Sequence, residues 1–490
     1  MKAPARIDWK AIDGFAIRRL VNDSRAVRPG DTFVAYPGQS RDGRDYIAEA
    51  LANRAAGVLW ESTGFAWNPH WCVRNLGMKD LRQHAGEIAS RVHGRPSRKL
   101  WMIGVTGTNG KTSCSQWIAQ ALMRAGRKCA VVGTLGHGLG GALKPAPNTT
   151  PDALWLHAQL AEFARRGARA VAMEVSSIGL DQDRVSGVEF DVALFTNLTR
   201  DHLEYHHTMR RYAEAKARLF AWESLKHAVV NLDDGYGREL ARRIRRPGLN
   251  VIGYGFSDAR SSRTSRVTGS NLVTDASGVS FDVKTPWGSA RVASPVLGRY
   301  NAYNLLGTLG VLLASGVTLR KAVAALAALK PVPGRLQRLG GGGKPLVVVD
   351  YAHTPDALKQ VLLTLRKLLA TNPSRLICVV GCGGERDRGK RPLMGSVAAR
   401  HADHAVITSD NPRGEDPQAI IADIVKGVRG GYSIEPDRAL AIREAIRAAR
   451  AGDIVLLAGK GHERYQEVGG KRHPFSDVAQ ASATLEETWR

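Results

Sequence analysis

Short apolar runs alternate with amphipathic, helix-like stretches along most of the chain. Five of these runs have the length of buried strands: 99–105, 169–174, 190–196, 345–350 and 453–458. Alternation of this kind is typical of βαβ units stacked on a largely parallel sheet. The sequence therefore predicts the α/β fold class.

The chain has 490 residues, which is too long for one hydrophobic core. Polar and glycine-rich breaks occur at 94–98, at 330–335 and at 340–343. We therefore expect three domains, 1–98, 99–333 and 334–490, with a largely parallel central sheet and a Rossmann-like C-terminal domain.

Composition indicates a soluble cytoplasmic protein. No stretch approaches the roughly 20 apolar residues of a membrane span, and the N-terminus lacks the apolar segment of a secretory signal. The five cysteines are odd in number and scattered, which suits a reducing compartment. Cys378 and Cys382 lack the spacing of a metal site, and we interpret them as buried small side chains.

The formal net charge is +25. The densest basic cluster, 241–248, contains no aromatic residues that would stack on bases, so a nucleic-acid-stimulated ATPase is only a minor alternative. Small substrates rich in phosphate explain the sign of the charge equally well.

The segment 105–112, VTGTNGKT, follows a predicted strand and precedes a helix-like stretch. Glycines in such a loop let backbone N–H groups face a phosphate at a helix N-terminus. Lys111 would then reach the β- and γ-phosphates of ATP, and the Thr112 hydroxyl would bind Mg²⁺. Val105 stands where the usual pattern has its first glycine, so the motif is not complete.

Two further predicted strands end in polar residues that suit metal binding. The first ends at Glu174, whose carboxylate is the ligand type that Mg²⁺ prefers, and the second leads into 197–202 and its His202. Ligands of open α/β sheets bind at the carboxyl ends of strands. A lone histidine is more often structural, and both interpretations of His202 stay open.

With these motifs the chain resembles the Mur ligase family, which builds the peptide of bacterial cell-wall precursors, from about Asp23 to Glu463. The matching elements are 106–112, 174–177, 197–202, 298–304, 333–335 and 350–353. Folylpolyglutamate synthetases share the ATP machinery, but the N-terminal segment 23–31 resembles the UDP-binding domain of the muramyl enzymes.

The resemblance implies a central P-loop ATPase domain that uses ATP and Mg²⁺. The nucleotide would be bound by Gly107, Thr108, Asn109, Gly110, Lys111, Thr112, Asn301, Arg335 and Asp350, and the metal ions by Thr112, Glu174, His202 and Lys216. Family members carbamylate the lysine that matches Lys216. Without the resemblance, Lys216 would be assigned to the solvated face of an amphipathic helix.

The resemblance also implies an acidic, UDP-linked muramoyl substrate. The matching residues are Ser24, Gln39, Ser40, Arg41, Asn148, Thr149, Thr150, Ser176, Gln182 and Arg184. Taken alone, 148–151 is an ordinary loop before a helix and 181–184 a polar turn. Ile178 stands where the family often has histidine, which puts one local hydrogen bond in doubt.

Within the family, the residues Asp410, Asn411, Pro412 and Arg413 resemble the motif of enzymes that add meso-diaminopimelate to UDP-N-acetylmuramoyl-L-alanyl-D-glutamate. Diaminopimelate exceeds lysine by one carboxylate, and an arginine fork suits a carboxylate. Arg386 would assist, while Gly459 and Glu463 would hold the amino end. Alone, 410–413 is a turn with a solvated arginine, and 459–463 is a turn after a strand.

The predicted reaction is formation of an acyl phosphate from the D-glutamate γ-carboxylate, followed by attack of the diaminopimelate amine. Lys111, Glu174, His202, Lys216 and Arg335 are the predicted catalytic residues. A lysine-adding muramyl ligase and a folylpolyglutamate synthetase-like ligase remain alternatives. We expect a monomer without nucleic-acid partners, although no residue pattern determines the oligomeric state.

Overall fold

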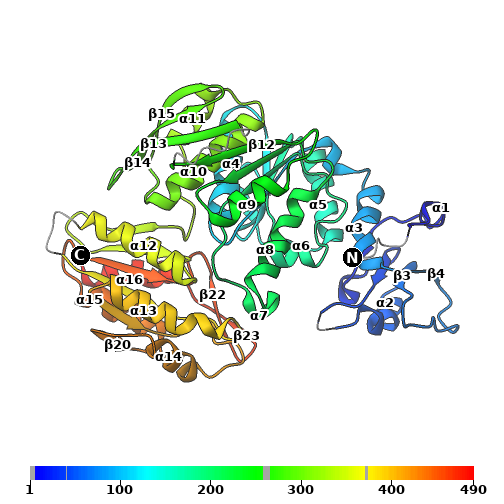
Figure 1. Ribbon diagram of the computed structural model, residues 1–490. Helices are drawn as coiled ribbons and strands as arrows, with labels where there is room; N and C mark the ends of the chain where they lie inside the picture. Colours follow the sequence, from blue (N-terminus) through cyan, green and yellow to red (C-terminus); the bar gives the residue numbers. More distant parts are fainter. Residues whose placement is uncertain (1–5, 40, 258–264, 370–373, 490) are drawn as a thin grey trace. The chain divides into compact units, whose positions relative to one another are not determined.

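The structure is a computed structural model that describes residues 6–39, 41–257, 265–369 and 374–489 (Figure 1). The chain forms two compact units, and it passes between them several times. The first unit comprises 1–106, 126–193 and 215–227, and the second comprises 107–125, 194–214 and 228–490. Parallel pairing dominates the sheets of both, which confirms the α/β class. The three domain boundaries stay a prediction.

The first unit begins with a parallel sheet of four strands in the order β1 (Leu20–Val21), β2 (Thr32–Ala35), β3 (Gly57–Glu61) and β4 (Arg74–Met78). Successive side chains point to opposite faces of a strand. Val34 and Leu59 accordingly pack with α3 (Leu81–Val92), whereas Phe33 and Val58 pack with α2 (Ile47–Ala52).

Another set of parallel strands in this unit includes the strand that ends at Glu174. The strands are β5 (Trp101–Thr106), β9 (Ala170–Glu174) and β6 (Cys129–Gly133), extended by the antiparallel β7 (Gly136–Leu139) and β8 (Ala142–Lys144). Val105 lies opposite Glu174 in the ladder. The end of β5 and Glu174 therefore meet at the same carboxyl edge.

The second unit contains the end of β10 (Val192–Phe195), followed in the sheet order by β11 (His227–Asn231), β12 (Asn250–Gly255), β13 (Ser265–Asp275), β14 (Gly278–Thr285) and β15 (Gly288–Ser294). The last three strands pair antiparallel. The helix α4 (Lys111–Arg124) packs against α10 (Arg299–Ala314), whose residues are mostly buried.

The C-terminal part of the second unit is a three-layer α/β structure, drawn in yellow to red in Figure 1. Its sheet has the order β16 (Gln337–Gly340), β17 (Leu346–Asp350), β21 (Ile454–Ala458), β18 (Leu376–Val380), β19 (His404–Ile407) and β20 (Tyr432–Ile434). All neighbours pair in parallel except β16 with β17.

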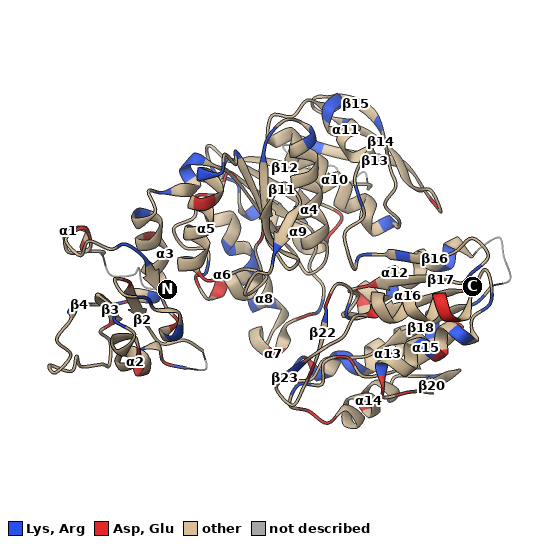
Figure 2. Ribbon diagram, turned by 180° about the vertical axis from the view of Figure 1, so that it is seen from behind, with Lys and Arg blue, Asp and Glu red and all other residues tan. Residues whose placement is uncertain are grey.

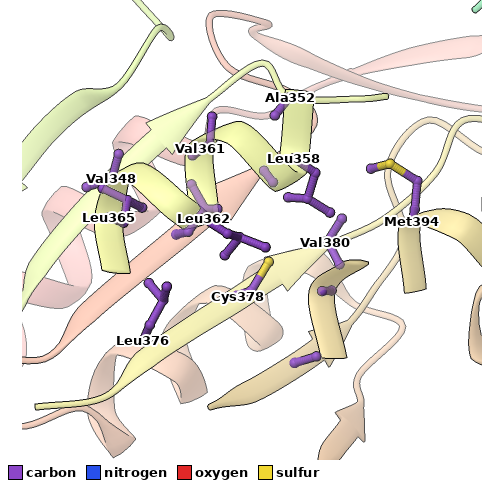
Figure 3. Packing of buried hydrophobic residues seen from close by; sticks show 14 of the residues in the cluster. Val348, Ala352, Leu358, Val361, Leu362, Leu365, Leu376, Cys378, Val380 and Met394 are labelled. Carbon is purple, nitrogen blue, oxygen red and sulfur yellow. The ribbon is translucent and has the colours of Figure 1, made fainter. Parts of the chain in front are cut away.

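Alternating side chains of these strands build a core on each face of the sheet. Val348, Cys378 and Val380 pack with α12 (Pro355–Leu368), α13 (Arg391–His401) and α14 (Pro417–Val425), as Figure 3 shows in part. Val347 and Val379 on the other face pack with α15 (Arg438–Ala448) and α16 (Asp477–Thr488).

The expectation that two cysteines are buried is confirmed. Cys378 and Cys382 are buried, and burial raises the pKa of each thiol to about 12, so both stay protonated. Lys and Arg are spread over the chain instead of gathering in one terminal segment (Figure 2). Among the helices of the described residues, none has the length and apolar character needed to span a membrane.

Two adjacent leucines of α12 test the C-terminal core. Leu362 is fully buried, whereas Leu363 is 38% exposed. Leu362→Ala should lower the free energy of unfolding by about 2–5 kcal/mol because it removes buried methyl groups and leaves a cavity. Leu363→Ala should cost less than about 1 kcal/mol. Denaturant-induced unfolding followed by circular dichroism measures both, and equal losses would contradict this assignment of the core.

Candidate active site

The phosphate loop fits its surroundings only because two of its positions are glycine. Gly107 has φ +145° and Gly110 has φ +88°, and both values favour glycine. A Cβ atom on Gly107 would lie 1.9 Å from the Thr196 hydroxyl oxygen, and one on Gly110 would lie 2.4 Å from Asn304 Oδ1. The backbone therefore approaches its neighbours more closely than any other residue permits.

The residues that follow β10 hold this loop in place. Asn109 N–H donates to Asn197 Oδ1 at 2.9 Å, and the Thr196 hydroxyl donates to the Asn109 carbonyl at 2.6 Å. The Lys111 ammonium donates to the carbonyl oxygens of Gly107 and Thr108, each at 2.9 Å. The predicted link between the phosphate loop and 197–202 is thus present, and the lysine charge lies over the loop.

Arg335 comes from the segment before β16 and reaches the start of α4. Its Nη2 donates to the Thr112 hydroxyl at 3.0 Å, and its guanidinium carbon lies 4.6 Å from the centre of the Tyr351 ring. Arg335 Nε is buried and has no hydrogen-bond partner among the described residues. A buried, unsatisfied cationic donor suits an anionic ligand such as a phosphate.

A cavity of about 320 Å³ gathers several of the predicted nucleotide residues. Its lining includes Asn109 and Gly110 of the loop together with Asn301, Arg335 and Asp350. Burial raises the pKa of Asp350, although Arg335 and the Leu336 N–H, at 2.7 Å, favour its charged form. The size falls in the usual range for ligand pockets.

The same cavity contains acidic residues that sequence reasoning missed, Asp233 and Asp234. Burial raises the pKa of Asp233, but hydrogen bonds from Ser257, Phe256 and Tyr303 outweigh burial and leave that pKa below its usual value. Burial keeps the pKa of Asp234 above its usual value. Both residues lie within three positions of the end of β11, so a search for acidic residues near strand ends would have found them.

Glu174 lies at the centre of a polar cluster in the first unit. It is 1% exposed, and its carboxylate accepts from Thr134 N–H at 2.8 Å and from the Thr134 hydroxyl at 3.1 Å. The Thr149 and Thr134 hydroxyls lie 3.0 Å apart, and the Thr150 hydroxyl donates to the Glu174 carbonyl at 2.9 Å. The loop 148–150, which is predicted to contact the substrate, therefore bonds directly to Glu174, a predicted metal ligand.

Other predicted substrate residues join this cluster. Arg184 donates to the Thr150 carbonyl at 3.0 Å and to Gln182 Oε1, and Gln182 donates to Gln39 Oε1 at 2.8 Å. The Ser176 N–H donates to the Thr150 hydroxyl at 3.0 Å. The structure thus brings together five of the predicted substrate residues: Gln39, Thr150, Ser176, Gln182 and Arg184.

The remaining residues predicted for this substrate are placed less tightly. Ser24 is buried and donates to Glu49 at 2.6 Å, whereas Arg41 and Asn148 are exposed. Ser40 lies outside the described residues. Ile178 lies half-buried on α6 (Ser177–Asp181), where its apolar side chain makes no hydrogen bond.

The predicted metal residues are divided between the two units, with Glu174 and Lys216 in the first and Thr112 and His202 in the second. Lys216 on α8 (Met209–Ala217) is only 1% exposed, so its placement on a solvated face is wrong. Within the described ranges, no group of three or more His, Cys, Asp and Glu side chains could hold a metal ion. Within the first unit, the buried Glu174 carboxylate is an oxygen donor of the type that suits Mg²⁺.

His202 adjoins a buried acid that sequence reasoning did not select. Asp201 is 5% exposed and lies 3.5 Å from nitrogens of His202 and His353 and 3.7 Å from Lys390 Nζ. Burial raises the pKa of Asp201, but these groups outweigh it and hold that pKa well below its usual range. Next to it, Arg200 donates to both carboxylate oxygens of Asp387 at 2.8 and 3.0 Å.

The residues predicted to bind the incoming amino acid follow three neighbouring parallel strands, β21, β18 and β19. Asn411 Nδ2 donates to Glu463 Oε2 at 2.8 Å, and the fully buried Lys460 donates to both residues. Arg413 Nη1 donates to the Gly384 carbonyl at 2.7 Å. The predicted residues after β19 and β21 are therefore directly bonded.

Close contacts also fix the other residues that are predicted to bind the incoming amino acid. A Cβ atom on Gly383 would lie 2.9 Å from Arg413 Nη1 and 3.7 Å from Arg386 Cγ, so both arginines adjoin one glycine. Gly459, at φ +112°, packs close to Asp410. Pro412 is buried, and its carbonyl accepts from the Glu415 N–H at 3.0 Å.

A buried ion pair bonds to the backbone at the start of two of these loops. Arg438 and Asp477 are both fully buried, and their side chains share hydrogen bonds of 2.8 and 2.7 Å. Arg438 also donates to the carbonyl oxygens of Ser409 and Ala458, at the ends of two strands. Burial lowers the pKa of Arg438, but Asp477 outweighs this effect and leaves it raised.

Comparison with known proteins identifies the family. Three family models match consecutive stretches of the chain: "Mur ligase family, catalytic domain" over 16–93, "Mur ligase middle domain" over 105–312 and "Mur ligase, glutamate ligase domain" over 334–461. The chain belongs to the Mur ligase family.

Individual relatives agree with this assignment. The UDP-N-acetylmuramoyl-L-alanyl-D-glutamate--2,6-diaminopimelate ligase of Nitrosomonas europaea is 51% identical over 476 residues, which cover 94% of this chain and 91% of the relative. A solved structure with that enzyme name is 39% identical, with a TM-score of 0.68 and coverage of 97% of this chain and 96% of the other. MurF ligase from Thermotoga maritima in complex with ADP, at 19% identity, 97% coverage of both chains and a TM-score of 0.64, shares the fold.

Gly110 gives a test of the phosphate loop. Gly110→Ala should abolish ATP binding measured by calorimetry, because its methyl group would overlap Asn304 and displace the loop. Gly126→Ala is the matched control, since Gly126 has a similar φ of +85° but no atom within 4 Å of its Cβ position. The control should lose about 1–2 kcal/mol of stability and retain ATP affinity. Unchanged ATP binding by Gly110→Ala would refute the assignment of this loop.

Proposed function

We propose that this chain is an ATP-dependent ligase that joins meso-diaminopimelate to the D-glutamate γ-carboxylate of UDP-N-acetylmuramoyl-L-alanyl-D-glutamate, a step of peptidoglycan precursor synthesis. The observation that carries the proposal is the pair of arginines, Arg386 and Arg413, beside the bonded Asn411 and Glu463. The names of relatives that share about half their residues with this chain support it.

The nucleotide side supplies charge neutralisation. The backbone of 107–112 and the N-terminus of α4 would cradle the phosphates of ATP, with Lys111 and Arg335 on the terminal ones. Phosphoryl transfer requires mainly positioning and stabilisation of charge. The γ-carboxylate attacks the γ-phosphorus, ADP leaves, and an acyl phosphate forms.

Mg²⁺ would be held by Thr112, Glu174, His202 and a carbamylated Lys216. When bound, it would supply positive charge that neutralises the phosphates. Lys216 is only 1% exposed, and a carbamate on its side chain would supply anionic oxygens of the type that Mg²⁺ prefers.

The acceptor side selects the amino acid and completes the bond. Glu463 pairs with an ammonium group of diaminopimelate, and Arg413 with Arg386 holds the distal carboxylate. The free amine attacks the acyl carbon, phosphate leaves, and the new amide bond replaces the acyl phosphate bond. Lysine lacks the distal carboxylate and would leave the arginines without their partner.

The activity is tested by substrate-dependent phosphate release. Release should require ATP, the UDP-muramoyl dipeptide and diaminopimelate together, and mass spectrometry should detect the tripeptide product. Lys111→Ala should remove activity because the terminal phosphates lose their cation. Preference for lysine would indicate the lysine-adding alternative, and a Lys111→Ala enzyme with normal turnover would contradict the nucleotide assignment.

The acceptor assignment is tested by Arg413→Ala. Loss of the guanidinium should cost about 2–3 kcal/mol of transition-state stabilisation for diaminopimelate, which lowers kcat/KM roughly 30- to 150-fold. The value of kcat/KM for lysine should stay nearly unchanged. Arg400→Ala is the matched control. Arg400 is an exposed arginine near the end of α13, and this helix precedes the amino end of β19, whereas Arg413 follows the carboxyl end of that strand. Equal effects of the two variants would exclude Arg413 from carboxylate recognition.

A further inference from the structure

Arg386 and Arg413 lie on separate loops, so recognition of one carboxylate requires that the spacing of the loops be fixed. Arg386 belongs to the loop after β18, and Arg413 to the loop after β19. Each loop contains a non-glycine residue with left-handed backbone: Glu385 at φ +53° and Arg413 at φ +53°. Such conformations persist only where surrounding contacts enforce them.

Glu415 makes contacts that join the two loops. Its Oε1 accepts from the backbone N–H of Glu385 at 2.5 Å and from Arg391 Nη2 at 2.9 Å. Its Oε2 forms an ion pair with Arg388 Nη2 at 3.0 Å. One carboxylate two residues after Arg413 therefore holds the residue immediately before Arg386.

The surroundings keep this carboxylate charged and in place. The Arg391 hydrogen bond is the main cause that lowers the pKa of Glu415 to about 2, so it is ionised throughout any practical assay range. Arg391 is almost fully buried and also donates to Asp423 at 3.1 Å. At the other side of the loop, Asp387 is held by Arg200. The segment that carries Arg386 is thus anchored on both sides.

We propose that Glu415 is a positioning residue that sets the spacing between Arg386 and Arg413 and so determines discrimination between diaminopimelate and lysine. The inference rests on the proposed function of this site. Glu415 would not contact the amino acid itself, and its effect would pass through the two arginines. A purely structural role would instead operate through neutralisation of the buried Arg391.

Asp423 separates the two roles, because it pairs with the same Arg391 but, within the residues that the structure describes, makes no hydrogen bond to the loop that carries Arg386. Glu415→Ala should raise KM for diaminopimelate at least 10-fold, lower the ratio of kcat/KM for diaminopimelate over lysine by a similar factor, and change KM for ATP less than 2-fold. Asp423→Asn should alter each of these values less than 2-fold. Glu415→Gln, which retains an oxygen for the Glu385 N–H, should restore part of the discrimination.

Steady-state kinetics of the full-length variants, with thermal unfolding as a check on folding, decide the matter. The proposal is overturned if Glu415→Ala keeps the wild-type ratio, or if Asp423→Asn lowers that ratio as much. Should Glu415→Ala fail to fold, Glu415→Gln decides: at least a 3-fold loss of discrimination supports the proposal, and wild-type discrimination overturns it. An unmutated enzyme that does not ligate diaminopimelate would refute the proposed function itself, whereas an active one with unaffected variants refutes only the role of Glu415.

Discussion

Backbone contacts that exclude even a methyl group fix the nucleotide side of this enzyme. Gly107 meets the Thr196 hydroxyl and Gly110 meets Asn304, so the loop is confined between the segment after β10 and the helix α10. The position of Lys111 and Thr112 at the start of α4 follows from that confinement. Arg335 in turn donates a hydrogen bond to Thr112, and this bond joins the segment before β16 to the phosphate loop. The positions of Lys111 and of the Thr112 hydroxyl that Arg335 contacts thus depend on two residues without side chains.

A different interaction organises the acceptor side. The fully buried pair Arg438–Asp477 bonds the ends of two strands through the carbonyls of Ser409 and Ala458. The loops that carry Arg413 and Glu463 begin directly after these carbonyls. Removal of one partner from such a pair leaves an uncompensated buried charge, so the bonds to both carbonyls require that the pair be intact.

Much of this was predictable from local sequence pattern. The predicted strands at 169–174 and 453–458 correspond to β9 and β21, because apolar runs between turns define buried parallel strands. The loop 107–112 and Glu174 fall at strand ends as expected. The solvated-face interpretation, which the helix pattern alone favoured for Lys216, is wrong, and the spacing of four residues from the buried Tyr212 indicated the inner helix face. The metal role of Lys216 stays a prediction. Asp201 and Glu415 were not predictable, since their importance arises from partners far away in sequence.

Lys111 meets its ligand with its ammonium already bonded to two carbonyl oxygens of its own loop. A nucleotide therefore exchanges bonds instead of adding them, and the lysine contributes only the difference between charge-assisted contacts to phosphate and the contacts it gives up. That difference is favourable for a polyanion and near zero for an uncharged nucleoside. In the proposed nucleotide site, Lys111 would therefore favour the triphosphate over an uncharged nucleoside such as adenosine.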